Sequence, residues 1–446
     1  MAVGHRVEPD RWRAETDRLL GRIAGRFPRV ETRRRAGRFL FGLLAGLPRK
    51  NCWTIAEHAG DPDPHGMQYL LGRAVWDTDG VRDDLRDYVT TNLGDSDAVL
   101  VVDETGDVKK GDQTVGVQRQ YTGTAGRIEN SQVAVYLTYA GARGHAMIDR
   151  ELYLPKSWTG DDQRCARAGV PADIGFLTKP ALATGMICRA LDAEVVARWV
   201  AGDEVYGADP ALRGELELRR VGYVLAIGCD RRVPTALGLV RADVLTASLP
   251  RRAWQRLSAG AGAKGERFYD WALITLNPPT NTPAAADAAD AADTQCWWLL
   301  VRRNRHTGEL AFYRCYSPEP VPLRELVRVA GRRWTVEESF QAGKGLAGLD
   351  EHQVRHWTSW RRWTVFALLA HALLAVIAAN DHTVRPAPAG LIALTCNEVQ
   401  RLLTSLVLTP ARSLVCPEAW SIWRRRHQHR ARTSHYQRQE AALHGA

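Results

Sequence analysis

Two aspartates that follow apolar, strand-like segments are the first candidates for chemistry. Asp103 follows AVLVV, and Asp203 follows VVARWVAG. Residues at the carboxyl ends of strands in an α/β sheet lie where such sheets place their reactions. Aspartate also often ends a strand or caps the next helix, so each residue alone says little. The two similar contexts together favour a shared role.

A glutamate with a cation on either side is the third candidate. It lies in RRWTVEESFQAGKG, residues 332–345. On a helix with 100° per residue, Glu337 and Lys344 lie about 40° and about 20° from Arg333. Glu338 lies about 140° away, so helical geometry selects Glu337 as the acid that shares a face with both cations. The same spacing is also typical of a surface salt bridge from Arg333 to Glu337.

The spacing Arg333-x3-Glu337-x6-Lys344 carries a family resemblance. It matches the Y-x2-R-x3-E-x6-K signature of bacterial insertion-sequence transposases, which are DDE enzymes with an RNase H-like catalytic core. The stretches VVDETG and AGDEVYG, around Asp103 and Asp203, resemble the strands that carry the first two aspartates of that family. The β-rich segment that follows them is similar to the β-strand insertion of one branch of the group.

One position departs from the signature. The signature's tyrosine belongs at position 330, where this chain has Ala330. Whatever the tyrosine ring contributes at a transposon end must come from elsewhere, for example from Trp334, or be absent. This departure bears on the branch of the family and not on the three acids. The resemblance covers roughly residues 35–435.

The resemblance implies a metal-dependent site. A phosphodiester is a poor electrophile because its negative oxygens repel the nucleophile, and two divalent metal ions relieve that repulsion. By resemblance, Asp103, Asp203 and Glu337 are the catalytic residues and the metal ligands. Mg²⁺ is the expected cofactor, with Mn²⁺ as a substitute, because hard cations prefer carboxylate oxygens. Arg333 and Lys344 would bind DNA phosphates beside the metals.

The implied enzyme is a DDE transposase, that is, a DNA endonuclease and strand transferase. It would cut double-stranded DNA at the inverted-repeat ends of an insertion sequence and join the released 3′-hydroxyls to target DNA. Both ends must be brought together, so we expect a homodimer on DNA and no membrane partner. Two other interpretations stay open. One is an inactive, transposase-derived DNA-binding regulator, and the other is a metal-dependent nuclease on the same core that cannot join ends.

Two adjacent tryptophans in the expected insertion are candidates for base stacking. Trp297 and Trp298 could stack on an extruded base, as insertion-domain aromatics do in relatives. Neighbouring strand positions point to opposite faces of a sheet, so at least one of the two rings is expected in the core instead.

The net charge of +10 is concentrated at the two ends of the chain. Residues 1–50 carry 13 Lys and Arg against five Asp and Glu, and residues 423–438 carry six Arg and no acid. Basic ends around a near-neutral middle indicate a polyanion held at the periphery, with chemistry at the centre. The alternative is that the arginine runs only solvate helices.

Composition also bears on the compartment. The eight cysteines show no CxxC or Cys/His metal spacing and indicate reduced thiols. The N-terminus shows no apolar signal segment, so we expect a cytoplasmic, nucleoid-associated protein. The apolar run at 363–379 is only 17 residues long and contains His371, which favours a buried core helix over a membrane span.

Together with the resemblance, the residue patterns predict an α/β protein. It would have an RNase H-like mixed-sheet catalytic core, an all-β insertion, and helical N- and C-terminal regions. The expected regions are a helical N-terminal DNA-binding region (1–92), the first part of the core (93–230), the β-strand insertion (231–320), the helical part of the core with the catalytic glutamate (321–385), and a basic helical C-terminal region (386–446).

Finer patterns predict individual elements. Helices at 52–59 and 64–75 around a Gly-Asp-Pro turn resemble a helix-turn-helix, although helical hairpins that bind nothing are more common. The Pro/Ala/Asp-rich segment 277–294 is expected to be a mobile loop or linker. Alternating or apolar patterns predict strands at 97–102, 131–140, 146–155, 195–202, 223–228, 267–276, 295–303 and 310–316.

Overall fold

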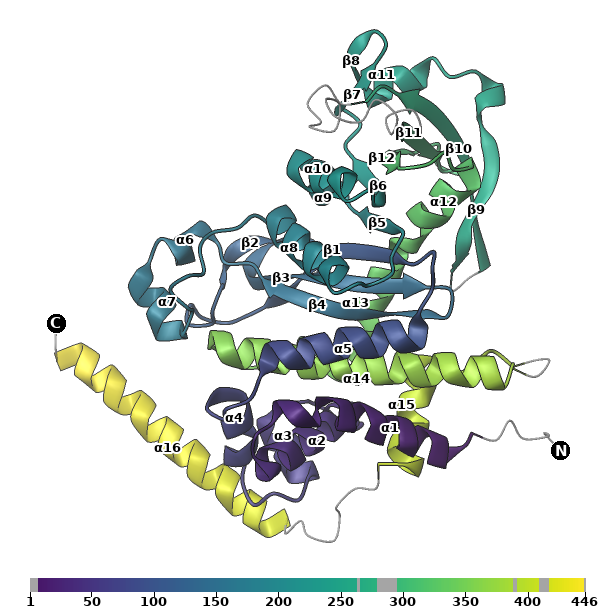
Figure 1. Ribbon diagram of the computed structural model, residues 1–446. Helices are drawn as coiled ribbons and strands as arrows, with labels where there is room; N and C mark the ends of the chain where they lie inside the picture. Colours follow the sequence, from purple (N-terminus) through teal and green to yellow (C-terminus); the bar gives the residue numbers. More distant parts are fainter. Residues whose placement is uncertain (1–6, 263–264, 279–294, 388–390, 409–416, 445–446) are drawn as a thin grey trace.

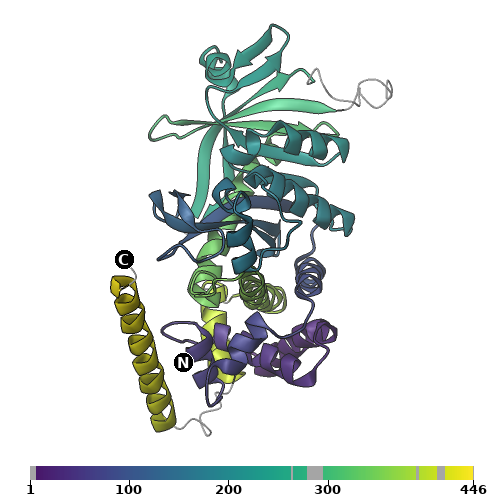
Figure 2. The same ribbon diagram turned by 90° about the vertical axis from the view of Figure 1, so that its left-hand side faces the viewer.

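A mixed sheet of ten strands runs through the middle of the protein, with helices packed around it (Figures 1 and 2). The fold is α/β, as predicted. The computed structural model describes residues 7–262, 265–278, 295–387, 391–408 and 417–444.

Five strands form the core half of this sheet. In sheet order they are β4 (Gly144–Leu152), β3 (Arg127–Gly141), β1 (Val99–Val108), β5 (Trp199–Gly202) and β6 (Gly222–Ile227). β4, β3 and β1 pair antiparallel, whereas β1, β5 and β6 pair parallel. The short β2 (Gln118–Thr122) pairs with the first residues of β3. This arrangement is the RNase H-like mixed sheet that the sequence predicts.

β5 is shorter than the strand predicted at 195–202. Trp199 pairs with Val99 on one side and with Gly222 on the other, and these are the first residues of β1 and β6. The residues before Trp199 therefore have no strand beside them. All four side chains of β5 are buried, as expected for a parallel strand covered on both faces.

Helices lie on both sides of the core strands in Figure 1. α8 lies by β1 and β3 in this view, α9 and α10 lie beside β5 and β6, and α5 and α14 run side by side below the strands. α12 and α13 pack on the face of β1 that Val99 and Val101 form. The bounds of these helices and of the short α6 and α7 are α5 (Thr78–Leu93), α6 (Lys156–Thr159), α7 (Asp162–Ala168), α8 (Lys179–Asp192), α9 (Glu204–Gly207), α10 (Pro210–Leu218), α12 (Leu323–Arg332), α13 (Trp334–Ala347) and α14 (Trp357–Val384).

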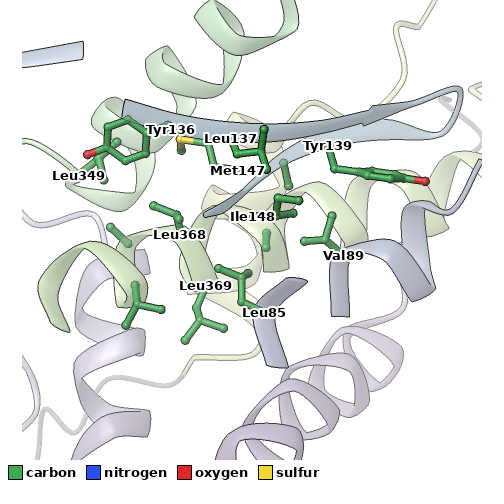
Figure 3. Close-up of a cluster of buried hydrophobic side chains, with 14 of the residues drawn as sticks. Leu85, Val89, Tyr136, Leu137, Tyr139, Met147, Ile148, Leu349, Leu368 and Leu369 are labelled. Atoms are coloured by element: carbon green, nitrogen blue, oxygen red, sulfur yellow. The ribbon is translucent and has the colours of Figure 1, made fainter. Parts of the chain in front are cut away.

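The main core lies between the sheet and the two lower helices. Leu85 and Val89 of α5 and Leu368 and Leu369 of α14 pack towards Ile148 and its neighbours on β3 and β4 (Figure 3). α14 is the one helix in the described part of the chain that is long and apolar enough to cross a membrane, and 94% of its apolar window is buried inside the protein. The prediction of a core helix at 363–379 is confirmed.

A second helical layer lies below α14 in Figure 1. The helices predicted at 52–59 and 64–75 are present as α3 and α4, and α3 begins with a capping box at Asn51. The C-terminal helix packs on this pair, because the Trp423 ring lies 4.7 Å from the Trp53 ring. The bounds are α1 (Pro9–Ile23), a 3₁₀ turn (Ala24–Arg26), α2 (Val30–Leu44), α3 (Cys52–His58), α4 (His65–Gly72), α15 (Cys396–Leu406) and α16 (Pro417–His444).

The insertion continues the core sheet and does not form a separate all-β unit. β12 pairs antiparallel with β6, from Phe312 with Ile227 to Tyr316 with Tyr223, and β11, β10 and β9 follow in order. A short helix and a 3₁₀ turn also interrupt the segment, so the all-β prediction is wrong in that respect. The bounds are β7 (Arg232–Thr235), β8 (Gly238–Arg241), α11 (Ala242–Ala247), a 3₁₀ turn (Arg251–Ala253), β9 (Gln255–Gly262), β10 (Gly265–Leu276), β11 (Cys296–Arg303) and β12 (Leu310–Ser317).

The three strands predicted within the insertion, at 267–276, 295–303 and 310–316, are present as β10, β11 and β12. Most of the segment expected to be a mobile loop or linker, residues 279–294, lies outside the described residues.

The core histidine predicts how stability depends on pH. His371 of α14 is 1% exposed, and burial, with His145 as the smaller cause, lowers its pKa to about 3 from 6.5. Between these values the unfolded chain binds a proton that the folded chain excludes, so stability falls with falling pH. We expect this histidine to remove about 2 kcal/mol of unfolding free energy between about pH 7 and pH 5.

Urea unfolding of the parent protein and of His371→Leu at both pH values measures how much unfolding free energy His371 removes. The parent should lose more stability than the variant over the interval, by about that amount. Equal losses in the two proteins would show that His371 is not held neutral.

Candidate active site

The parallel pairing of β1 with β5 brings Asp103 and Asp203 together. Val102 pairs with Gly202, and each aspartate is the next residue in its chain segment. Neighbouring strands lie about 4.8 Å apart, so the two aspartates lie side by side just beyond the last paired residues of β1 and β5. Asp203 also caps α9, because its Oδ1 accepts a hydrogen bond from the backbone N of Val205 at 2.9 Å.

The sequence predicts that Asp103 lies at the end of its strand, but the structure does not place it there. β1 continues to Val108, and Asp103 is opposite Tyr136 in the antiparallel ladder with β3. The parallel ladder with β5, however, stops at Val102, because the chain leaves β5 at Gly202 to begin α9. Asp103 therefore lies where β1 has lost its pairing with β5 but still pairs with β3.

Arg333 joins Asp103 to Glu337. Its Nη1 lies 3.5 Å from Oδ2 of Asp103, and its Nη2 donates to Oε1 of Glu337 at 3.1 Å. Asp103 lies on the face of β1 that packs against α12 and α13, because side chains alternate along a strand. The structure thus brings the two aspartates, Arg333 and Glu337 into one cluster.

Glu338 points away from this cluster, as the helical stripe predicts. Its Oε2 lies 3.2 Å from Nε2 of His145 on β4. The hydrogen bond with His145 is the largest cause of the lowered pKa of Glu338. The two adjacent glutamates therefore have different partners.

Lys344 lies on the same stripe of α13 but contacts a later part of β1. Its Nζ donates to Oγ1 of Thr105 at 2.8 Å and to Oγ1 of Thr124 at 3.2 Å. The Nζ also lies 3.8 Å from Oδ1 of Asp107, whose Oδ2 lies 3.2 Å from Nε2 of the buried His352. These contacts fix the Lys344 ammonium beside β1, two residues beyond Asp103.

The acids in this cluster are short of positive charge. Burial, and then the neighbouring Asp203, raise the pKa of Asp103 to about 7, although Arg333 acts against them. Burial, and then Glu104, raise the pKa of Asp203. Burial also raises the pKa of Glu337. Arg333 contacts Asp103 and Glu337, and Arg267 acts more weakly on Glu337, yet the pKa values of the acids stay raised, so a bound cation would relieve the remaining repulsion.

The carboxylates of this cluster suit a hard divalent cation, although they do not converge on a single metal position in this structure. Carboxylate oxygens with surplus negative charge are the ligands that Mg²⁺ prefers. Within the described ranges, no group of three or more Asp, Glu, His or Cys side chains lies close enough together to hold a metal ion. Glu337 instead faces Arg333, so it would have to exchange that partner to join the aspartates in binding an ion.

Comparison with known proteins identifies the family. Residues 22–254, more than half of the chain, match the family described as DDE superfamily endonuclease. The chain belongs to this family. The match includes Asp103 and Asp203 and ends before Glu337.

Two known proteins are similar to this DDE endonuclease. It is 25% identical over 327 residues, which are 71% of this chain and 75% of the relative, to a protein of Microchaete diplosiphon described as "Probable transposase for insertion sequence element IS701". A solved structure, "Cryo-EM structure of piggyBac transposase synaptic complex with hairpin DNA", is similar over 92% of this chain and 84% of that chain, with a TM-score of 0.41 and 12% identity. The predicted resemblance to insertion-sequence DDE transposases is confirmed.

Glu104 is a further acid that the spacing does not select. Lys179, at the start of α8, lies 2.6 Å from its Oε1, and the Tyr206 hydroxyl of α9 donates to its Oε2 at 2.6 Å. Alternation along β1 places Glu104 on the opposite face from Asp103. That alternation is the sequence signal that separates the two adjacent acids of this DDE endonuclease. Glu104 thereby ties β1 to the helix that Asp203 caps.

The two tryptophans of β11 are buried in this structure. Trp297 and Trp298 are each 7% exposed and belong to hydrophobic clusters on opposite faces of the sheet. Neither ring presents a face to an extruded base here. The exposed ring near the acids is instead Trp334, which is 41% exposed. Ala330, at the position of the signature's tyrosine, is buried at 7% exposure.

The insertion is fastened to the corner between α12 and α13. A Cβ at Gly331 would lie 1.9 Å from the backbone O of Ala259 on β9, so only glycine fits. Arg267 of β10 donates from Nη2 to the backbone O of both residues, at 3.2 Å each. Its guanidinium also lies 5.8 Å from the Trp334 ring. The β9–β10 hairpin thus supports the start of α13, next to Arg333.

Gly331→Ala should therefore disturb the site from a distance. The added methyl group must push β9 away from the α12–α13 corner, at an expected loss of about 1–3 kcal/mol of unfolding free energy. Thermal or urea unfolding measures the loss. Gly345→Ala on α13 is the matched control, because nothing lies within 4 Å of its Cβ position, and it should be neutral or stabilising. Equal stability of the two variants would contradict the close approach of β9.

Proposed function

We propose that this chain is the transposase of an insertion sequence. It cuts double-stranded DNA at the inverted-repeat ends of the element and joins the released 3′-hydroxyls to target DNA. The observation that carries the proposal is the cluster at one edge of the sheet, in which Asp103 and Asp203 lie side by side and Arg333 links Asp103 to Glu337. Membership of the DDE family and the similarity to a probable transposase support it.

In this proposal Asp103, Asp203 and Glu337 hold Mg²⁺, with Mn²⁺ as a substitute. The ions supply Lewis acidity at the phosphoryl group and stabilise the leaving oxygen. The chain's own part is to present three carboxylates from separate elements with too little positive charge around them. That shortage, seen in the raised pKa values, favours cation binding.

Arg333 and Lys344 bind the DNA phosphates. A guanidinium can make two parallel hydrogen bonds to a phosphate, whereas an ammonium acts as a point charge. In this structure Arg333 contacts Asp103 and Glu337, and in the proposed complex its guanidinium would turn from these acids to a phosphate of the substrate. Lys344, held by two threonine hydroxyls, lies at the same edge of the sheet.

Asp103→Asn, Asp203→Asn and Glu337→Gln should each abolish metal-dependent cutting. Loss of groups that only orient metal ligands costs about 10- to 100-fold, so loss of a ligand should cost more than about 100-fold. Cleavage of a duplex that carries the inverted repeats flanking the gene, with Mg²⁺ or Mn²⁺, measures the effect. Binding of the same duplex in EDTA should persist, which would show that the variants are folded.

Glu338→Gln is the matched control for Glu337→Gln. It neutralises the adjacent glutamate, whose partner is His145 and not Arg333, so cleavage should stay close to that of the parent. The assignment of Glu337 is wrong if Glu337→Gln still cuts or if Glu338→Gln is the inactive variant. A regulator without catalytic activity would bind the duplex and never cut it, whatever the metal.

Joining distinguishes the transposase from a nuclease on the same core. A transposase requires two DNA ends in one complex, so we propose that a homodimer assembles on DNA. Incubation of pre-cut ends that carry 3′-hydroxyls with a supercoiled plasmid should give joined products. Ends that lack the 3′-hydroxyl should give none, and cutting without any joining would favour the nuclease.

A further inference from the structure

Four arginines line one pocket outside the acid cluster. The pocket has a volume of about 350 Å³, and its cations are Arg213 of α10, Arg231 and Arg232 beyond the end of β6, and Arg314 of β12. We call these four residues the arginine pocket. Asp230 is the one carboxylate among the lining residues. The pocket therefore carries a surplus of about three positive charges, which is unusual for a surface on which cations normally find acidic partners.

The inner part of the pocket is formed by two half-buried arginines, Arg213 and Arg314. Tyr313 and Cys315 point into the core beneath α12, so Arg314 between them points to the opposite face of the sheet. The Nε of Arg314 is buried and has no hydrogen-bond partner among the described residues. Burial, and then repulsion from Arg314, lower the pKa of Arg213. An anion would satisfy both guanidiniums.

Other arginines of the same region have acidic partners. Arg219, at the end of α10, pairs with Glu215 at 2.6 Å and with Asp192 at 2.5 Å, and Arg241 pairs with Asp243 at 2.6 Å. No ion pair joins Arg231, Arg232 or Arg314 to a carboxylate within the described part of the chain. Neighbouring acids thus neutralise Arg219 and Arg241, whereas three of the four pocket arginines have no such partner among the described residues.

A four-residue helix fixes the pocket relative to the acids. Asp203 caps the first turn of α9, and the last residue of α9, Gly207, lines the pocket and accepts a hydrogen bond from Arg213. A Cβ at Gly207 would lie 1.8 Å from the backbone O of Ala226, so α9 lies directly on β6. At 1.5 Å per residue, α9 separates its two ends by about 6 Å.

We propose that the arginine pocket binds a backbone phosphate of the DNA other than the one at Asp103 and Asp203. This inference rests on the proposed function. The pocket lies at the far end of α9 from Asp203, and Arg314 points to the face of the sheet opposite Asp103, so the two sites contact different phosphates. Guanidinium forks match phosphate oxygens in pairs, and four of them around one anion suit a phosphodiester better than a single carboxylate.

The salt dependence of DNA binding tests the proposal without any cutting. Arg314→Gln and the double variant Arg231→Gln/Arg232→Gln remove charge from the pocket and leave Arg213 to hold Gly207. Binding of an arbitrary 30-bp duplex in EDTA is measured by fluorescence anisotropy over a series of NaCl concentrations. The slope of log Kd against log salt should fall by about 0.9 for each DNA phosphate that a variant no longer neutralises. Affinity at low salt should fall about tenfold.

Arg219→Gln is the matched control. It removes the same charge from the neighbouring helix end, where the arginine already has acidic partners, so its slope should equal that of the parent. Arg314→Lys keeps the charge and should recover part of the slope, which separates a charge effect from misfolding. The proposal is overturned if Arg314→Gln and Arg219→Gln bind DNA alike.

Two further measurements locate the ligand. If inorganic phosphate binds the pocket in calorimetry while the DNA salt slope does not depend on Arg314, the pocket takes a small phosphate and the DNA assignment is wrong.

Duplexes with one neutral methylphosphonate, stepped along each strand from the cut site, should include one at which Arg314→Gln causes no further loss of affinity. Coupling at no position on either strand would refute the assignment of the pocket to a DNA phosphate. Failure to cut any DNA would count against the proposed function and leave the salt result intact.

Discussion

The parallel pairing of β1 with β5 is the constraint on which the site depends. Because Val102 lies opposite Gly202, two aspartates that are 100 residues apart in the chain become neighbours at the end of this ladder. The alternation of β1 then sends Asp103 towards α13 and Glu104 towards α8 and α9. One short ladder thus determines which helices can contact the acids, and the later contacts of Arg333 and Lys179 follow from it.

Sequence reasoning was most successful where local geometry decides. The 3.6-residue period of one helix was enough to separate Glu337 from Glu338, and their different partners bear this out. Apolar and alternating runs predicted the core strands and the core helix, and the motif indicated the family. Pairing between distant segments could not be obtained in this way. The continuation of β1 past Asp103 depends on β3, and the joining of the insertion to the core sheet depends on the β6–β12 ladder.

The same limit applies to the surroundings of the site. The partners of Glu104 come from two helices, and the contact at Gly331 is with a strand more than 70 residues earlier. No spacing rule connects such residues. The contact nevertheless explains why the insertion matters to the site, because Arg267 supports the corner from which α13 begins. The insertion therefore supports the helix that carries Glu337 and also extends the sheet.

Within the described residues, the charges of the acid cluster and of the arginine pocket are left unbalanced. Opposite charges a few ångströms apart normally form ion pairs, but α9 lies between Asp203 and the arginine pocket, and Arg213 is turned to the backbone of Gly207. The acids therefore keep a surplus of negative charge, and the pocket keeps a surplus of positive charge. A divalent cation alone would satisfy the first and repel the second. In the proposed function both surpluses are relieved together, because metal ions bind the acids and a backbone phosphate of the DNA binds the arginine pocket.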